Sequence, residues 1–349
     1  MKKKIFVENV EISENADCFM IAEIGHNHQG DFELCKRMIK KAKDCGATAV
    51  KLQKRDNKLL YTTAMYNKPY ENENSYGATY GEHREFLEFS AEQYKELQAY
   101  AREIGIIFFA TAFDIKSADL LHGLDMPAYK IASGDVKNIP LLRHIAAFGK
   151  PMFISTGACE LEDVRRAYAA VKPINDQIIL LQCTAGYPPK YEEINLNVIG
   201  TYKKHFPDAI IGLSSHDSGI VLSAVAYAMG AAVVEKHYTL QRASKGTDHA
   251  FSLESHDLRE LMMNLKNIRA SMGDGVKRVY DDEKAPAQKM GKSLYFARDM
   301  AAGEAVEADD LDIKSPAGGV APYGVEGLAG KRLAVDVKKE QLVEYSHFE

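Results

Sequence analysis

Short apolar runs alternate with longer amphipathic stretches along most of the chain. Runs such as Phe19–Glu23 and Ile210–Ser214 are bounded by turn residues and have the length of buried strands. The stretch Phe32–Cys45 repeats apolar residues at helical spacing, and Gly46 stands where a helix should end. The pattern therefore predicts strands that alternate with helices, which is typical of a parallel sheet covered by helices.

Predicted strands, each followed by a helix, make up the larger part of the chain. In order they are Phe19–Glu23, Ala47–Gln53, Ile106–Thr111, Ala128–Ile131, Met152–Ser155, Ile178–Gln182, Ile210–Ser214 and Ala231–Glu235. Eight strand–helix pairs over about 250 residues favour an α/β fold of the (β/α)8 TIM-barrel type over an open, doubly wound sheet. The stretch Gly25–Gly30 also lacks the glycine spacing of a dinucleotide-binding loop.

The pattern changes at both ends of this barrel. Residues 1–17 carry two short alternating runs, which fit a hairpin at one end of a barrel domain that spans residues 1–275. Residues 276–292 are charged and show no strong period, so they are interpreted as a linker. Residues 293–349 combine glycines with short strand patterns and predict a small β-rich domain. Its expected strands are Ser293–Ala297, Leu311–Ile313 and Leu333–Val335.

The composition is that of an ordinary globular protein, with 46% hydrophobic and 27% charged residues in a chain of 349. A net charge of −5 without a basic stripe argues against nucleic acid as a partner. No apolar run approaches the roughly 18 residues of a membrane span, and none resembles a signal peptide, so we expect a cytoplasmic protein without a membrane partner. The five cysteines form no CxxC pair, which favours reduced thiols over a structural zinc site.

Polar side chains gather where the predicted strands end, whereas the strand interiors are apolar. Because the carboxyl ends of barrel strands face one mouth, we expect these side chains to form a single site. Lysines supply charge and hydroxyl groups supply oriented donors, a combination that suits a phosphorylated anion. The alternative to such an anion-binding site is an ion network in which Lys51 and Lys130 pair with the nearby carboxylates. The residues concerned are Glu23, Lys51, Gln53, Thr111, Lys130, Ser133, Asp135, Ser155, Thr156, Thr184, Tyr187, Ser214 and Glu235.

Two histidines stand at the ends of consecutive predicted strands, His216 after the seventh and His237 just after the eighth. One histidine at such a place is more often a hydrogen-bonded structural residue, but two on adjacent strands favour a shared metal ion. Two protein ligands leave several positions open, which suits Mn²⁺, Mg²⁺ or Co²⁺ better than a closed zinc site. His26 and His28 are expected in a loop near the mouth, and Cys183 is expected in the core.

Several motifs follow one another in order over nearly the whole chain. They are AEIGHNHQGD (Ala22–Asp31), KLQK (Lys51–Lys54), YKIASGD (Tyr129–Asp135), ISTGA (Ile154–Ala158), LQCTAGYP (Leu181–Pro188), GLSSHDSG (Gly212–Gly219), VEKHYTL (Val234–Leu240) and GTDHAFSLE (Gly246–Glu254). Together they resemble the sialic acid synthase family. The segment Lys292–Pro316 looks like the antifreeze-like (SAF) domain of that family.

The resemblance implies an enzyme that condenses phosphoenolpyruvate with an N-acylmannosamine-type sugar and releases phosphate. It implies a divalent metal, manganese first, on His216 and His237, where it polarises the open-chain aldehyde, and it implies that Glu23 positions or deprotonates a water. It also implies a domain-swapped homodimer, in which the SAF domain of one subunit caps the barrel of the other. The implied phosphoenolpyruvate-binding residues are Lys51, Thr111, Lys130, Ser133, Ser155 and Ser214. The implied sugar-binding residues are Gln53, Asp135, Tyr187 and Asp248.

The identity of the sugar stays open at this point. Ser315 stands where many bacterial members carry an arginine that reaches the N-acyl group of the sugar. The stretch Thr79–Ser90 looks more like the animal enzymes, which use the sugar 6-phosphate. Lys54 and Arg55 would supply charge for such a phosphate or else lie in a solvated loop. The expected product is N-acetylneuraminate or its 9-phosphate. The alternatives are legionaminic, pseudaminic or deaminated neuraminic acid, and a sugar-binding barrel without catalysis.

Overall fold

The computed structural model describes residues 3–349, so the first two residues of the predicted hairpin segment lie outside the described part. The chain divides into two compact units, Met1–Met272 and Gly273–Glu349. Each unit has its own hydrophobic core, and each is described by itself below. In the described part of the chain, no helix has both the length and the apolar character needed to cross a membrane.

The first unit is a closed barrel, in which eight parallel strands pair in chain order within the described residues and β10 closes onto β3. The strands are β3 (Phe19–Gly25), β4 (Ala49–Lys54), β5 (Ile107–Ala112), β6 (Tyr129–Ile131), β7 (Met152–Ser155), β8 (Ile178–Cys183), β9 (Ile210–Ser215) and β10 (Val233–His237). This confirms the predicted (β/α)8 fold. At the closure, His237 lies opposite Glu23, so the first and last strands bring their polar ends together. His237 is the last residue of its strand rather than the residue after it.

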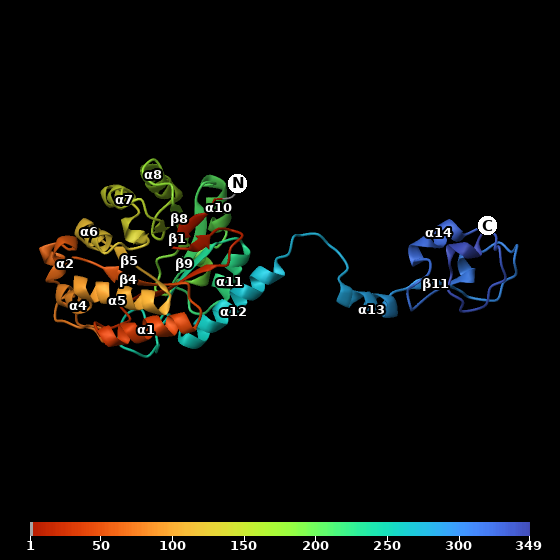
Figure 1. The fold of residues 1–349 in the computed structure, drawn as a ribbon, viewed down its shortest axis with the longest axis horizontal. Helices are drawn as coiled ribbons and strands as arrows, with labels where there is room; N and C mark the ends of the chain where they lie inside the picture. Colours follow the sequence, from red (N-terminus) through yellow and green to blue (C-terminus); the bar gives the residue numbers. More distant parts are fainter. Residues whose placement is uncertain (1–2) are drawn as a thin grey trace. The chain divides into compact units, whose positions relative to one another are not determined.

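Helices surround the strands on the outside of the barrel (Figure 1). The main ones are α1 (Phe32–Asp44), α5 (Ala91–Ile104), α6 (Ile115–Gly123), α7 (Ile139–Ala146), α8 (Leu161–Val171), α10 (Val198–His205), α11 (Val221–Ala228) and α12 (Ser255–Ser271). Their apolar faces pack on the outward-facing strand residues, as Met38 and Ile39 of α1 do. Helix α5 begins with the capping box of Ser90 and Gln93 that its sequence indicates.

A small hairpin lies at the amino-terminal end of the barrel strands. Strands β1 (Ile5–Val7) and β2 (Val10–Ile12) pair antiparallel. Ile5, Val7 and Ile12 are at most 2% exposed and pack with inward-facing strand residues, including the stacked rings of Phe109 and Phe153. Apolar side chains therefore fill this end of the barrel interior, whereas polar side chains occupy the opposite mouth.

The long segment after β4 is ordered by short helices rather than by a sheet. They are α2 (Asn57–Leu60), α3 (Thr63–Tyr66) and α4 (Tyr80–Phe86). Helix α4 begins with a reciprocal capping box between Thr79 and Glu82, which fixes its entry into the fold. Shorter helical turns also follow β6, as η1 (Ser133–Asp135), and β8, as α9 (Tyr191–Ile194).

The second unit differs from the sequence prediction at two places. Its regular elements are α13 (Asp281–Met290), β11 (Ser293–Phe296), η2 (Ala308–Asp310), β12 (Leu311–Lys314), η3 (Pro322–Gly324), α14 (Val325–Leu328) and η4 (Tyr345–His347). The predicted linker contains the helix α13, which has no buried residue, so its sequence shows no hydrophobic period. The strand predicted at Leu333–Val335 is wrong: Leu333 is buried, but it forms only an isolated bridge with Phe348.

Candidate active site

A cavity of about 740 Å³ opens at the carboxyl ends of the barrel strands. Every residue to which the resemblance assigns a role lines it except Asp135, whose Oδ1 accepts a hydrogen bond from Asn138 Nδ2 at 3.1 Å. Thr156 and Thr184, also expected at the strand ends, do not line it. The predicted residues that line the cavity are Glu23, Lys51, Gln53, Thr111, Lys130, Ser133, Ser155, Tyr187, Ser214, His216, His237 and Asp248. The barrel therefore brings together side chains that come from all eight strands or the loops that follow them.

The deepest part of the site is a buried ion cluster around Lys51. Its Nζ lies 2.6 Å from Glu23 Oε2 and 3.8 Å from Glu235 Oε1, and it donates to Thr111 Oγ1 at 2.7 Å. Lys130 Nζ lies 3.4 Å from the same Glu235 oxygen. The ion network that the sequence offers as the alternative is thus present, and its members line the cavity. Two ammonium groups and two carboxylates share this small volume.

The two carboxylates of the cluster differ in their electrostatics. Burial, with the nearby charge of Glu235, raises the pKa of Glu23 above its usual value, although Lys51 opposes the shift. Burial acts on Glu235 as well, but Lys130 and Lys51 together hold its pKa below the usual value. Glu235 therefore serves as the ionised counter-charge, and Glu23 is the carboxyl better suited to exchange a proton near neutral pH.

Some buried polar atoms in the cavity have no hydrogen-bond partner among the described residues. They include Ser155 Oγ and Glu235 Oε2. Leaving a buried polar atom unpaired costs about 1–3 kcal/mol. A ligand that supplied anionic oxygens and a hydroxyl or water would satisfy these atoms, so they mark the deep cluster as a binding surface.

The two histidines lie side by side at the mouth, with ring centroids 5.4 Å apart. His216 Nδ1 lies 3.1 Å from the carbonyl oxygen of Thr184, which assigns the proton to Nδ1 and leaves Nε2 as a lone-pair donor. His237 Nδ1 is buried and has no hydrogen-bond partner in the described structure. Phe251 packs against both rings.

This histidine pair fits a divalent metal ion. Burial, with His237 beside it, lowers the pKa of His216 to about 4, and burial also lowers the pKa of His237. Both imidazoles are therefore neutral near pH 7, the form that binds metal. Among residues 3–349 no group of three or more metal-ligating side chains exists, so a metal here would keep open positions for water and substrate oxygens.

A second buried ion pair holds the loop that carries His216. Lys236 Nζ lies 2.8 Å from Asp217 Oδ1 and also donates to the Asp217 carbonyl, and both side chains are at most 2% exposed. We expect Lys236→Met to lower the free energy of unfolding by about 3–5 kcal/mol, because it leaves the Asp217 carboxylate buried and unpaired. Urea denaturation measures the change.

The exposed pair of Lys150 and Asp125, 3.0 Å apart, provides the control. Lys150→Met should cost less than about 1 kcal/mol. Equal losses in the two variants would contradict a special role for the buried pair.

Several residues that line the cavity were not placed in the site from the sequence. They include Arg55, Asn74, Arg84 and Thr247. Glu235 is expected at this mouth, but the resemblance assigns it no role in binding, and Arg55 is expected only together with Lys54 just beyond its strand. Glu235 stands two residues before His237 on the same strand, so the two side chains face the same side. Arg84 and Asn74 lie in the long segment after β4, where no periodicity indicates side-chain direction.

Three further residues lie near the mouth, and His26 and His28 are in the turn after β3, as the sequence predicts. Cys183 is buried, as expected of a core residue, but it lines the cavity, and burial raises the pKa of its thiol. His28 is buried and stacks on Phe89 with ring centroids 4.1 Å apart. His26 lies among the side chains of two arginines beside the cavity.

Comparison with known proteins identifies the family. The sequence profile of the NeuB family matches residues 38–277, and that of the SAF domain matches residues 291–349. The chain belongs to the NeuB family. It is 42% identical to the N-acetylneuraminate-9-phosphate synthase of Mus musculus over 93% of this chain and 91% of that protein. It is 34% identical to the N,N'-diacetyllegionaminic acid synthase of Legionella pneumophila over 95% of each chain.

A solved structure supports the same family assignment for this chain. The N-acetylneuraminic acid (sialic acid) synthetase of Leptospira borgpetersenii superposes with a TM-score of 0.72 at 31% identity, over 82% of this chain and 95% of that one. These relatives are synthases, and the chain is an enzyme of that kind. The resemblance drawn from the motifs is thereby confirmed.

Proposed function

We propose that this protein condenses phosphoenolpyruvate with N-acetylmannosamine, or its 6-phosphate, to give N-acetylneuraminate, or its 9-phosphate, and inorganic phosphate. One observation carries the proposal: a single cavity joins a buried lysine and hydroxyl cluster to a pair of neutral histidines across the same barrel mouth. The mouse relative named for the 9-phosphate synthase, at 42% identity, supports it.

The lysine cluster suits the phosphoenolpyruvate half of the reaction. Lys51 and Lys130 offer two positive charges, and Ser155 Oγ offers an unpaired hydroxyl. The remaining donors that we assign to phosphoenolpyruvate are Thr111, Ser133 and Ser214. Because Glu23 and Glu235 already neutralise the lysines in part, the anion would replace some carboxylate contacts rather than enter an unpaired positive site.

The histidine side suits the sugar. A divalent ion held by His216 and His237, Mn²⁺ first and Mg²⁺ or Co²⁺ otherwise, supplies Lewis-acid polarisation of the open-chain aldehyde. Gln53, Tyr187 and Asp248 line the same cavity and would hold the sugar. Asp135, which does not line it, is the fourth residue that we assign to the sugar. Tyr187 lies against His216, with ring centroids 4.1 Å apart, so it restricts the position of that imidazole.

The proposed reaction forms one carbon–carbon bond, consumes one water and releases one phosphate. Carbon 3 of phosphoenolpyruvate forms a bond with the aldehyde carbon, and the aldehyde oxygen takes up a proton. Water adds its oxygen to carbon 2, and the bond between carbon 2 and the phosphate oxygen breaks. Glu23, with its raised pKa, would position the water and accept its proton, while Gln53 Nε2 donates to Glu23 Oε1 at 2.7 Å and orients the carboxyl.

We further propose a homodimer, in which the SAF domain of one subunit caps the barrel of its partner, and a cytoplasmic location. What supports the dimer is the match of residues 291–349 to the SAF domain. Ser315, directly after β12, stands in this domain where many bacterial members carry an arginine. Sedimentation of the purified chain at several concentrations tests the dimer, and a monomer at all of them would contradict it.

Phosphate release provides the direct test of the proposed activity. We expect the purified protein with Mn²⁺ to release phosphate from phosphoenolpyruvate only when an acceptor sugar is present. The kcat/KM should be highest for N-acetylmannosamine or its 6-phosphate, and lower for mannose and for a 2,4-diacetamido sugar. Preference for mannose or for the diacetamido sugar would instead indicate a synthase of a related nonulosonic acid. Sugar binding without phosphate release would indicate a barrel that has lost catalysis.

A further inference from the structure

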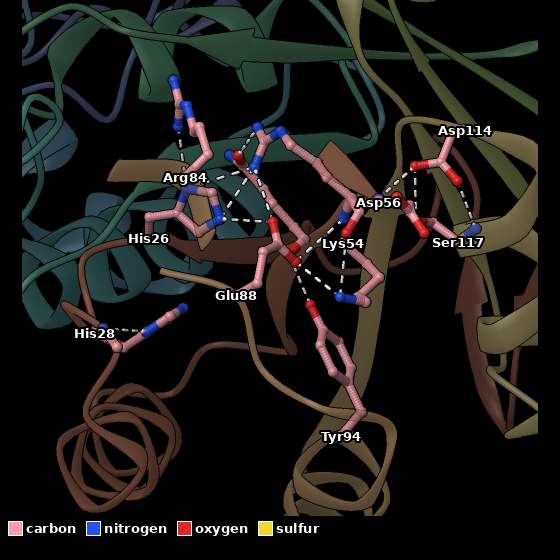
Figure 2. Close-up of polar contacts among 12 residues, drawn as sticks. His26, His28, Lys54, Asp56, Arg84, Glu88, Tyr94, Asp114 and Ser117 are labelled. Carbon is pink, nitrogen blue, oxygen red and sulfur yellow. Dashed lines mark hydrogen bonds and ion pairs between the residues drawn. The ribbon is translucent and has the colours of Figure 1, made fainter. Parts of the chain in front are cut away.

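A second group of cations lies beside the cavity, separate from the lysine cluster. Arg55, one residue beyond β4, and Arg84, on α4, both line the cavity. Figure 2 shows Arg84 on one side of the ring of His26 and Glu88 on the other, with Lys54 next to Glu88. The guanidinium of Arg55 lies over the ring of Phe113 at 3.9 Å, and the residue is only 7% exposed.

Positive charge exceeds negative charge in this group. Glu88 lies 2.9 Å from Lys54 Nζ and 3.8 Å from Arg55 NH1, so one carboxylate serves two cations. Arg84 forms no ion pair within 4 Å among the described residues, and its Nε donates to Tyr80 Oη at 3.0 Å. Asp248, which lines the same cavity, is the further carboxylate that acts on Arg84, so Glu88 and Asp248 together face three cations. Lys54 does not line the cavity, whereas the two arginines do. The excess charge therefore faces the cavity through the arginines.

The ring of His26 cannot satisfy both arginines at once. Arg55 NH1 lies 3.0 Å from His26 Nε2, and Arg84 NH1 lies 3.3 Å from His26 Nδ1. A neutral imidazole has one accepting and one donating nitrogen, whereas a guanidinium only donates. Burial and the two arginine charges hold the pKa of His26 well below its usual range, so the ring stays neutral. One guanidinium N–H thus faces another N–H, and an anionic oxygen would give it an acceptor.

We propose that Arg55 and Arg84 form a subsite for a phosphomonoester on the acceptor sugar, so that the substrate is the sugar 6-phosphate. This inference rests on the proposed function. A chain of contacts places the subsite next to the acceptor: Glu23 accepts from Gln53, and Arg55 donates to Gln53 Oε1 at 2.6 Å. The phosphoenolpyruvate phosphate has its own cations in Lys51 and Lys130, which leaves the arginines for a second phosphate.

The test compares phosphorylated and unphosphorylated sugar in matched variants. We expect Arg84→Gln to lower the ratio of kcat/KM for N-acetylmannosamine 6-phosphate to kcat/KM for N-acetylmannosamine by about 10- to 100-fold, the effect of losing a charge-assisted bond. Arg84→Lys should restore part of the ratio. The control is Arg102→Gln on the exposed side of α5, which should leave the ratio and both rates unchanged.

Two kinetic results would contradict the proposed subsite. One is a fall of kcat/KM by the same factor for both sugars, and the other is a rise in KM for phosphoenolpyruvate alone, which would assign the arginines to that substrate.

Calorimetric binding of the two sugars to wild-type and Arg84→Gln protein needs no turnover. Tighter binding of the 6-phosphate that is lost in the variant supports the subsite, and equal binding contradicts it. A wild-type protein that releases no phosphate with either sugar would contradict the proposed function, and the binding comparison would then decide the subsite alone.

Discussion

Replacing His237 by alanine is expected to lower kcat by on the order of 10³-fold or more, while the fold is retained. The substitution removes one of two imidazoles that would hold the metal, and with it the polarisation of the aldehyde, which is worth several kcal/mol. His237 Nδ1 has no protein hydrogen-bond partner in the described residues, so its loss breaks no hydrogen bond of that nitrogen. Phosphate release in the presence of Mn²⁺ measures kcat, and thermal unfolding checks the fold.

The matched control is His256→Ala on α12, where the side chain is 86% exposed and does not line the cavity. It should retain wild-type kcat. Chelation provides an independent test of the metal: wild-type protein stripped of divalent metal should release no phosphate, and added Mn²⁺ should restore the rate. Titration of Mn²⁺ into wild-type and His237→Ala protein should show binding only in the former. Near-normal rates in the variant, or full activity in excess chelator, would remove the metal from the mechanism.

The barrel could be predicted from the sequence because its strands are buried on both sides. Such strands give short, nearly continuous apolar runs, and the run Met152–Ser155 matches β7 at both ends. The polar residues that end these runs all face one mouth, so the strand pattern also predicted most of the cavity lining. Closure of β10 onto β3, which sets His237 opposite Glu23, depends on the register of distant strands and had no local signal.

No comparable sequence pattern predicts the arginine subsite. Arg84 comes from a helix of seven residues, α4, within a segment of short helices and turns. Its direction depends on the capping of α4 and on the ring of Tyr80, over which its guanidinium lies at 5.0 Å. The strand predicted at Leu333–Val335 in the second unit is wrong for a related reason. Leu333 has the burial of a strand residue, but its backbone bonds to Gly303 and Glu304 in a loop. Apolar burial alone does not distinguish a strand residue from a buried loop residue.

Replacing Glu23 by glutamine is expected to lower kcat by about 10²- to 10⁴-fold, the usual contribution of a positioned acid or base. The amide keeps the shape of the side chain and can still bond Gln53, but it can no longer accept a proton from water. It also weakens the contact with Lys51 Nζ, 2.6 Å away in the wild type, so stability must be measured beside the rate. The control is Glu92→Gln on the exposed first turn of α5, which should leave kcat unchanged.

The pH profile separates catalysis by Glu23 from a structural role. A carboxylate that accepts a proton loses activity as pH falls through its pKa, and burial places the pKa of Glu23 above the usual value. The acidic limb of the wild-type profile should therefore lie at higher pH than for an ordinary glutamate, and Glu23→Gln should lack that limb at its reduced rate. If Glu23 served only to neutralise Lys51, the variant would lose thermal stability while keeping both its rate and the limb. Because Glu235 remains ionised beside the same lysine, the cluster keeps a counter-charge in the variant, and a loss confined to kcat assigns the proton transfer to Glu23.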